Sequence, residues 1–128
     1  MSKQILIIDD DAAVREAFEL ALEETGYEVS SAAGGAAGID QVKQRVPDFI
    51  FLDLKMPGMD GVETLRRIRQ GMAPDIPIYI VTAFMPEFLQ ELAAAAKEGL
   101  QFGLGQKPLS GEQIRLIVQG VLEQAQSY

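Results

Sequence analysis

Five side chains suited to metal binding and phosphoryl transfer each follow a short apolar segment of the sequence. They are Asp9, Asp10, Asp53, Thr82 and Lys107. If the apolar segments are parallel strands, their carboxyl ends meet at one edge of a sheet, which is where ligands bind in such folds. The sequence therefore predicts that these residues, although far apart in the chain, form one site.

Three of these residues are carboxylates, whose charges repel one another when they are packed together. One pair of like charges at ~4 Å costs on the order of 4 kcal/mol at an effective dielectric of about 20. Such a cluster is usually accompanied by a divalent cation or by a raised pKa, and carboxylate oxygens suit Mg²⁺. We therefore expect Asp9, Asp10 and Asp53 to bind Mg²⁺, whereas Asp11 is expected to cap the following helix.

Asp53 is the expected nucleophile, because a carboxylate can attack phosphorus and form an aspartyl phosphate. The Lys107 ammonium and Mg²⁺ would spread the negative charge that develops on the phosphoryl oxygens. The Thr82 hydroxyl would donate a hydrogen bond to one of these oxygens. The peptide bond between Lys107 and Pro108 can be cis or trans, and the sequence leaves this open.

Charge and composition exclude several other classes of function. The 128 residues carry 11 Lys and Arg against 19 Asp and Glu, a formal net charge of −8, so we expect no direct contact with nucleic acid or membrane. Cys and His are absent, which excludes disulfides, thiolate catalysis, Ser-His-Asp triads and N/S zinc sites. Apolar runs are too short for a signal or membrane span, and we expect a cytoplasmic protein.

Short apolar runs alternate with amphipathic helical patterns along the chain. The expected strands cover residues 5–8, 27–29, 49–52, 76–81 and 102–106. The expected helices cover residues 14–22, 39–46, 62–68, 88–96 and 114–122. This alternation predicts an α/β fold, a parallel sheet with helices on both faces. The length predicts a single domain spanning 1–128, with a core at about 4–124.

Local signals mark the starts of several helices. Asp60 and Ser110 are expected to cap the third and fifth helices. Glu112 lies one position short of the capping-box position counted from Ser110. Gly34, Gly35 and Gly38 complete no phosphate-binding motif, and they are expected to form a loose segment that leads into the second helix.

The most specific motif is Phe-Leu-Asp-Leu-Lys-Met-Pro-Gly-Met-Asp-Gly at 51–61. Together with Ile-Leu-Ile-Ile-Asp-Asp-Asp at 5–11, Ile-Val-Thr-Ala at 80–83 and Lys-Pro at 107–108, it resembles the receiver domain of bacterial two-component response regulators. The resemblance covers the whole chain. It implies a flavodoxin-like, doubly wound five-stranded parallel sheet in the order 2-1-3-4-5.

The resemblance also implies how the acidic residues would work. Asp53 would accept a phosphoryl group from a sensor histidine kinase or a histidine phosphotransfer protein. Mg²⁺ would be bound directly by Asp10 and Asp53, through water by Asp9, and by the main-chain carbonyl of Lys55. The chain would thus be a phospho-accepting switch that catalyses only its own phosphoryl transfer and, at most, its own dephosphorylation.

The remaining implied roles concern the output of the switch. Thr82 would move toward the phosphoryl group, and Lys107 would pair with it. The surface of the fourth helix, fifth strand and fifth helix would then change, and a downstream protein partner would bind it. The partner and the kinase are not identified by the sequence.

The sequence departs from the receiver pattern near its fifth strand. Receivers usually carry Tyr or Phe three residues before the lysine, where this chain has Leu104, and the nearest aromatic residue is Phe102. The segment between Thr82 and Lys107 is also longer than usual. Two hypotheses for the switch follow: Phe102 serves in a re-registered strand, or a lengthened, Ala-rich fourth helix is the moving element.

An apolar group is expected near the start of the fourth helix. It consists of Phe84, Met85, Phe88 and Leu89. One interpretation is a surface for a partner or a second copy, and the other is an ordinary core face. A further hypothesis is that Phe84 shields the acyl phosphate from water.

Two functions from other classes remain as alternatives. An aspartyl-nucleophile phosphatase would share the nucleophile, but it needs an acid two residues later to protonate the leaving group, where this chain has Lys55. A degenerate receiver that binds proteins independently of phosphorylation is the stronger alternative, because of Leu104 and the altered fifth strand.

Overall fold

Five parallel strands form one sheet in the computed structural model, which describes residues 2–73, 75–83 and 86–123. The strands are β1 (Gln4–Ile8), β2 (Glu28–Ala32), β3 (Phe49–Leu52), β4 (Ile78–Thr82) and β5 (Gly103–Gln106). Their order in the sheet is β2-β1-β3-β4-β5, which confirms the expected topology.

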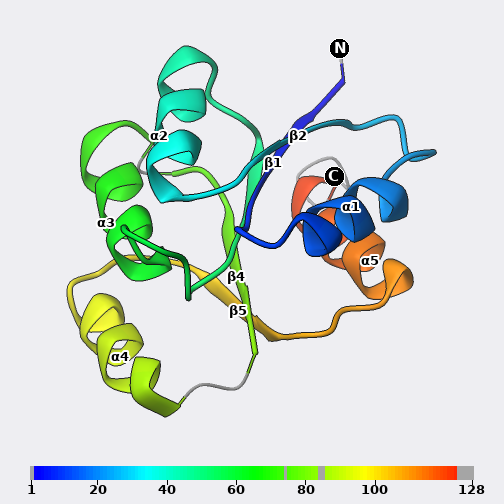
Figure 1. Cartoon of the computed structure of the whole chain (residues 1–128). Helices are drawn as coiled ribbons and strands as arrows, with labels where there is room; N and C mark the ends of the chain where they lie inside the picture. The colour runs from blue at the N-terminus through cyan, green and yellow to red at the C-terminus, as the bar shows by residue number, and fades with distance from the viewer. Residues whose placement is uncertain (1, 74, 84–85, 124–128) are drawn as a thin grey trace.

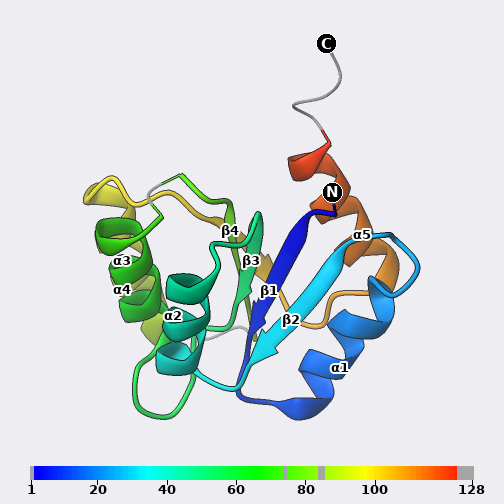
Figure 2. The ribbon, with the colours of Figure 1, turned by 90° about the horizontal axis from the view of Figure 1, so that it is seen from above.

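Helices cover both faces of this sheet, as predicted (Figure 1). They are α1 (Ala12–Ala21), α2 (Gly35–Gln44), α3 (Gly61–Gly71), α4 (Leu89–Lys97) and α5 (Gly111–Leu122), with a short 3₁₀ helix, η1 (Pro86–Phe88), before α4. Figure 2 shows α1 and α5 on one face, and α2, α3 and α4 on the other. Among the described residues, no helix combines the length and apolar character that crossing a membrane would require.

The two faces of the sheet carry separate hydrophobic clusters, which explains the uninterrupted apolar runs of the central strands. In β3, Ile50 and Leu52 pack into the cluster on one side, whereas Phe49 and Phe51 pack into the cluster on the other. All four side chains are at most 1% exposed. Because burial of one such side chain contributes about 1.5–3 kcal/mol, the central strands are strongly fixed, and so are the residues that follow them.

The helix starts follow the expected caps, with one correction. Asp11 and Asp60 accept hydrogen bonds from the backbone N–H groups of Ala13 and Glu63, respectively. Ser110 caps α5 and forms a complete capping box, which the sequence analysis missed because it considered only Glu112. Gln113, at the third helical position, supplies the reciprocal hydrogen bond.

The prediction of a loose segment before the second helix was wrong for Gly35 and Gly38, whereas Gly34 does precede α2 as its N-cap. Gly35 is the first residue of α2, and Gly38 lies within its first two turns. Both are buried where another side chain leaves no room for a Cβ atom: Thr64 of α3 packs against Gly35, and Ile8 of β1 packs against Gly38. These glycines therefore allow α2 to lie close to the sheet and to α3.

The fourth helix begins after a short 3₁₀ turn. α4 has nine residues and follows η1 directly, and the hypothesis that the fourth helix is the moving element stays a prediction. Of the expected apolar group, Phe88 packs against the core and Leu89 is 53% exposed. Phe84 and Met85 lie outside the described residues.

Candidate functional site

The register of the sheet places Asp9 and Asp53 side by side. Ile8, the last residue of β1, pairs with Ala32 of β2 and with Leu52 of β3. The backbone N–H of Asp9 donates to the carbonyl of Ala32 at 3.1 Å, and that of Asp53 donates to the carbonyl of Ile8 at 2.9 Å. The ladder of hydrogen bonds therefore continues one residue past the strands and fixes both aspartates at the carboxyl edge.

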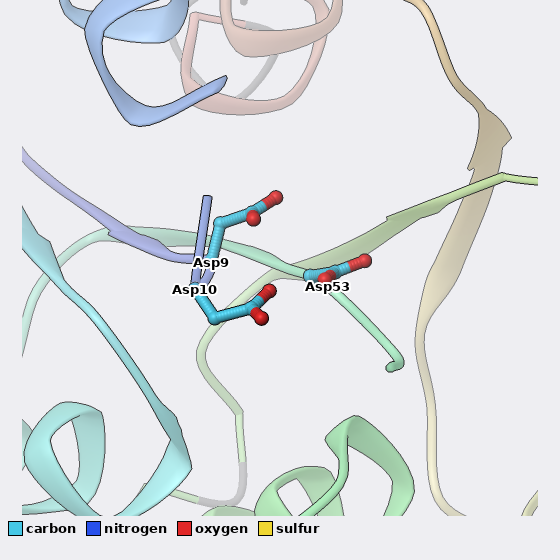
Figure 3. Close-up of side chains that lie close together, drawn as sticks. All are labelled: Asp9, Asp10 and Asp53. Atoms are coloured by element: carbon cyan, nitrogen blue, oxygen red, sulfur yellow. The ribbon is translucent and has the colours of Figure 1, made fainter. Parts of the chain in front are cut away.

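Asp10 completes a cluster of three carboxylates at this edge. One oxygen from each of Asp9, Asp10 and Asp53 lies within 4.8 Å of the others. Asp9 and Asp53 are buried, whereas Asp10 is exposed. Figure 3 shows the three side chains extending toward the same side of the strand ends. The structure thus brings together all three predicted acidic residues in an arrangement that suits a hard cation approached from solvent.

Lys107, the residue that follows β5, contacts this cluster although β4 lies between β5 and β3 in the sheet. Its Nζ donates to Asp9 Oδ2 at 2.9 Å and lies 3.3 Å from Asp53 Oδ1. The Lys107 backbone is held by an N–H bond to the carbonyl of Thr82, and the Lys107–Pro108 peptide bond is cis. One ammonium group therefore partly neutralises two buried carboxylates.

The environment of Asp53 changes its acidity. Burial and, to a lesser extent, the charge of Asp9 raise the pKa of Asp53 to about 6, although the Lys107 ammonium opposes both effects. Burial lowers the pKa of Lys107, but the hydrogen bond and charge of Asp9, with the charge of Asp53, bring this pKa above its usual value. Lys107 therefore stays a cation, while the Asp53 carboxylate is energetically costly to keep charged in the metal-free protein.

Asp9 is held by contacts that the sequence analysis did not foresee. The backbone N–H of Asp11 donates to Asp9 Oδ1 at 2.9 Å. Arg15, in the first turn of α1, folds back so that its Nη1 donates to the main-chain oxygen of Asp9 at 2.7 Å. The only signal for Arg15 in the sequence is a cation six residues after the first aspartate of the site.

Two predicted site residues stand apart from the carboxylates. Thr82 ends β4, is half-buried, and lines an apolar cavity of about 340 Å³ together with Ala83 and Leu92. Lys55 lies two residues after Asp53 with an exposed side chain. Within the described part of the chain, no hydrogen bond or ion pair joins either side chain to the acidic cluster.

Leu104, the unexpected residue of β5, lines the same cavity and is 50% exposed. It pairs with Ile80 of β4, and β5 runs in register to Lys107. Phe102 lies just before β5 and packs against the core. Leu104 thus keeps the position three residues before the lysine, and the strand has not shifted to bring Phe102 there.

Gly61 begins α3 directly beneath the segment that follows Asp53. A Cβ atom at this position would overlap the carbonyl of Asp53 and the Cα atom of Leu54. Because both are backbone atoms, the helix and the loop cannot both keep their places if Gly61 gains a side chain. The glycine is therefore required for the close packing of α3 against the site.

We predict that Gly61→Ala lowers the free energy of unfolding by about 1–3 kcal/mol, because overpacking forces the backbone to shift. Gly120→Ala is the matched control: it lies within α5 with open space around it, and a gain of about 0.5–1 kcal/mol is expected from helix propensity. Urea unfolding monitored by circular dichroism measures both. A neutral Gly61→Ala variant would contradict the packing argument.

Comparison with known proteins identifies the family of this fold and site. Residues 5–119 match the family described as the response regulator receiver domain. The response regulator MprA of Mycobacterium tuberculosis is 42% identical over 83 residues, which cover 65% of this chain and 36% of MprA. The transcriptional regulatory protein AfsQ1 of Streptomyces coelicolor is 43% identical over 79 residues, which cover 62% of this chain and 34% of AfsQ1. The match therefore spans about a third of the length of these curated relatives.

Solved structures show the same fold over nearly the whole chain. A CheY-like receiver domain protein from Methanospirillum hungatei superposes with a TM-score of 0.86 at 25% identity, covering 98% of both chains. The chemotaxis protein CheY4 of Vibrio cholerae superposes with a TM-score of 0.79 at 29% identity, covering 95% of this chain and 100% of CheY4. The fold expected from the sequence is therefore confirmed.

Proposed function

The chain belongs to the response regulator receiver domain family, and we propose that it is a phospho-accepting switch with Asp53 as the acceptor. The observation that supports this proposal is that three carboxylates and the Lys107 ammonium lie close together at one edge of the sheet. We propose that a sensor histidine kinase or a histidine phosphotransfer protein supplies the phosphoryl group in the cytoplasm, and that residues 1–128 act as one receiver domain.

The acidic cluster fits Mg²⁺ by the chemistry of its donors. All three clustered ligand atoms are carboxylate oxygens, the class of donor that Mg²⁺ prefers, and the sequence contains no Cys or His. Asp10 and Asp53 would hold the ion directly, Asp9 through water, and the main-chain carbonyl of Lys55 would complete the protein ligands. A bound Mg²⁺ would neutralise charge on the phosphoryl oxygens during transfer.

The side chains of this chain divide the remaining tasks. A carboxylate oxygen of Asp53 attacks the phosphorus of the donor's phosphohistidine, so that a P–O bond forms as the P–N bond breaks and the imidazole leaves. The burial of Asp53 at the strand end limits the orientations that its carboxylate can take. Lys107, already 3.3 Å from Asp53 Oδ1, exchanges part of its carboxylate contact for the incoming phosphoryl oxygens. Thr82 moves from the rim of the cavity so that its hydroxyl donates a hydrogen bond to a phosphoryl oxygen. Apart from its own phosphorylation and, at most, its own dephosphorylation, the chain catalyses no reaction.

The first test is the intact mass of the protein after incubation with a small acyl phosphate. One added phosphoryl group is expected with Mg²⁺, and none with EDTA or in Asp53→Asn. Asp40→Asn is the matched control, because this exposed residue of α2 lies outside the cluster, and it should be phosphorylated normally. Modification of Asp53→Asn, or modification that is insensitive to EDTA, would contradict the assignment.

A phosphorylation-independent interaction module remains the second candidate, and Leu104 is the observation that favours it. Leu104 is aliphatic and half-exposed, whereas the resemblance to receivers implies an aromatic switch residue at this position. If phosphorylation occurs but leaves partner binding unchanged, the chain is an interaction module with a vestigial site. Backbone amide spectra with and without the phosphoryl group would distinguish the two: a switch shifts resonances of α4, β5 and α5, and a module leaves them unchanged.

A further inference from the structure

We infer that Arg15 is a positioning residue of the proposed magnesium site, and that its guanidinium fixes the turn between β1 and α1 so that Asp9 and Asp10 face Asp53. This inference rests on the proposed function, because it concerns the same acidic cluster. It assigns a role to a cation that touches neither a carboxylate of the cluster nor the acceptor.

The contact itself is short and bridges two elements. Arg15 Nη1 donates to the main-chain oxygen of Asp9 at 2.7 Å, and the Arg15 backbone N–H donates to the carbonyl of Asp11 at 3.1 Å in the first bonds of α1. Arg15 therefore connects the helix to the last residue fixed by the sheet. Hydrogen bonds from a charged donor are roughly twice as strong as neutral ones, which suits a tether of this kind.

Every polar group of Asp9 is engaged once this contact is included. Its N–H binds the carbonyl of Ala32, its main-chain oxygen accepts from Arg15, and its two carboxylate oxygens accept from the Asp11 N–H and from Lys107 Nζ. Both the backbone direction and the rotamer of Asp9 are therefore determined. Removal of Arg15 leaves the main-chain oxygen, and with it the direction of the turn, without that donor.

Asp10 depends on this arrangement more than Asp9 does. Its side chain is exposed and, among the residues that the structure describes, makes no hydrogen bond of its own. The place of its carboxylate therefore follows from the backbone of its two neighbours. Asp9 is fixed by the sheet and Arg15, and Asp11 is fixed as the cap of α1 through Ala13.

The charge of Arg15 and its role as a tether have opposite effects on Mg²⁺ binding. The direction in which the Mg²⁺ affinity changes when Arg15 is removed therefore tests the inference. Removing a positive charge near the cluster would by itself strengthen Mg²⁺ binding. Removing a tether that orients the ligands would weaken it, typically by 10-fold or more for a residue that supports metal ligands from behind. If Arg15 acts by position, its removal therefore weakens Mg²⁺ binding in spite of the charge.

The experiment is a calorimetric titration of Mg²⁺ into the unphosphorylated wild type, Arg15→Met and Arg15→Lys. Arg45→Met is the matched control: it removes the same charge from an exposed residue that pairs with Glu28 at the start of β2, the opposite end of the sheet. We expect a roughly 10-fold higher dissociation constant for Arg15→Met, an intermediate value for Arg15→Lys, and no loss of affinity for Arg45→Met.

A second readout separates positioning from a general effect on stability. With a small acyl phosphate as donor, the Mg²⁺ concentration that gives half the maximal rate should rise in Arg15→Met, while the rate at saturating Mg²⁺ changes less than about 2-fold. A structural role alone would lower the unfolding midpoint in EDTA and leave this Mg²⁺ dependence unchanged. If Arg15→Met does not fold, Arg15→Gln, which keeps an amide donor, replaces it.

The outcomes are distinct. Equal or tighter Mg²⁺ binding by Arg15→Met, with a wild type that binds Mg²⁺, would overturn the positioning role and leave the proposed function intact. A wild type that does not bind Mg²⁺ would overturn both. A fall in the rate at saturating Mg²⁺ without a change in Mg²⁺ affinity would also overturn the inference, because it would place Arg15 at the phosphoryl group.

Discussion

Lys107→Met is expected to slow phosphorylation of Asp53 by a small acyl phosphate by roughly 10²-fold or more at saturating Mg²⁺. Lys107 Nζ lies 2.9 Å from Asp9 and 3.3 Å from Asp53, so its positive charge is within reach of oxygens arriving at Asp53. Loss of one preorganised donor for transition-state charge typically costs 10²–10³-fold in rate. The measurement is the time course of intact mass at fixed donor concentration.

Lys43→Met is the control for this substitution, since it removes the same charge from an exposed residue of α2 and should leave the rate unchanged. Lys107→Arg keeps the charge but replaces a compact ammonium with a larger planar fork. It should recover only part of the rate, because the contact to two carboxylates depends on shape as well as on charge. A Lys107→Met variant that is phosphorylated as fast as wild type would show that Lys107 is a structural counter-ion only.

The sequence was most informative where burial determines the pattern. The runs at 5–8 and 49–52 are apolar on both faces because helices cover both sides of the sheet, so the residues directly after them had to meet at its edge. Asp9, Asp53 and Lys107 could therefore be assigned to one site before any contact was known. The pattern of apolar residues and the position of a polar residue directly after an apolar run are sufficient for this inference, because a parallel sheet aligns the ends of its strands.

Features that depend on a particular close contact could not be predicted in this way. Gly35 and Gly38 look flexible in the sequence, yet they lie on the buried face of α2, where Thr64 and Ile8 occupy the space of their missing side chains. That requirement appears only when α2, α3 and β1 are seen together. Arg15 is a similar case, since its partner is a main-chain oxygen and carries no residue-specific signal.

The pKa of Asp53 has a consequence for the stability of the metal-free protein. With EDTA at pH 7, Asp53→Asn is expected to raise the free energy of unfolding by about 2–3 kcal/mol. The folded-state pKa is about 6, raised mainly by burial and then by the charge of Asp9, whereas an unfolded aspartate titrates near pH 4. At pH 7 the wild type must therefore keep a costly buried carboxylate that asparagine does not carry.

The pH dependence of this gain follows from the same shift. Between about pH 4 and pH 6 the folded wild type holds a proton that the unfolded chain has lost, so wild-type stability falls as pH rises through this window. The gain of Asp53→Asn should therefore be small at pH 4, grow up to about pH 6 and stay constant at pH 7, as urea unfolding at each pH would measure. Asp40→Asn, in an exposed position, should change stability by less than about 0.5 kcal/mol. A gain that is equally large at pH 4 would mean that asparagine improves packing or hydrogen bonding, and that the charge of Asp53 is not what destabilises the metal-free site.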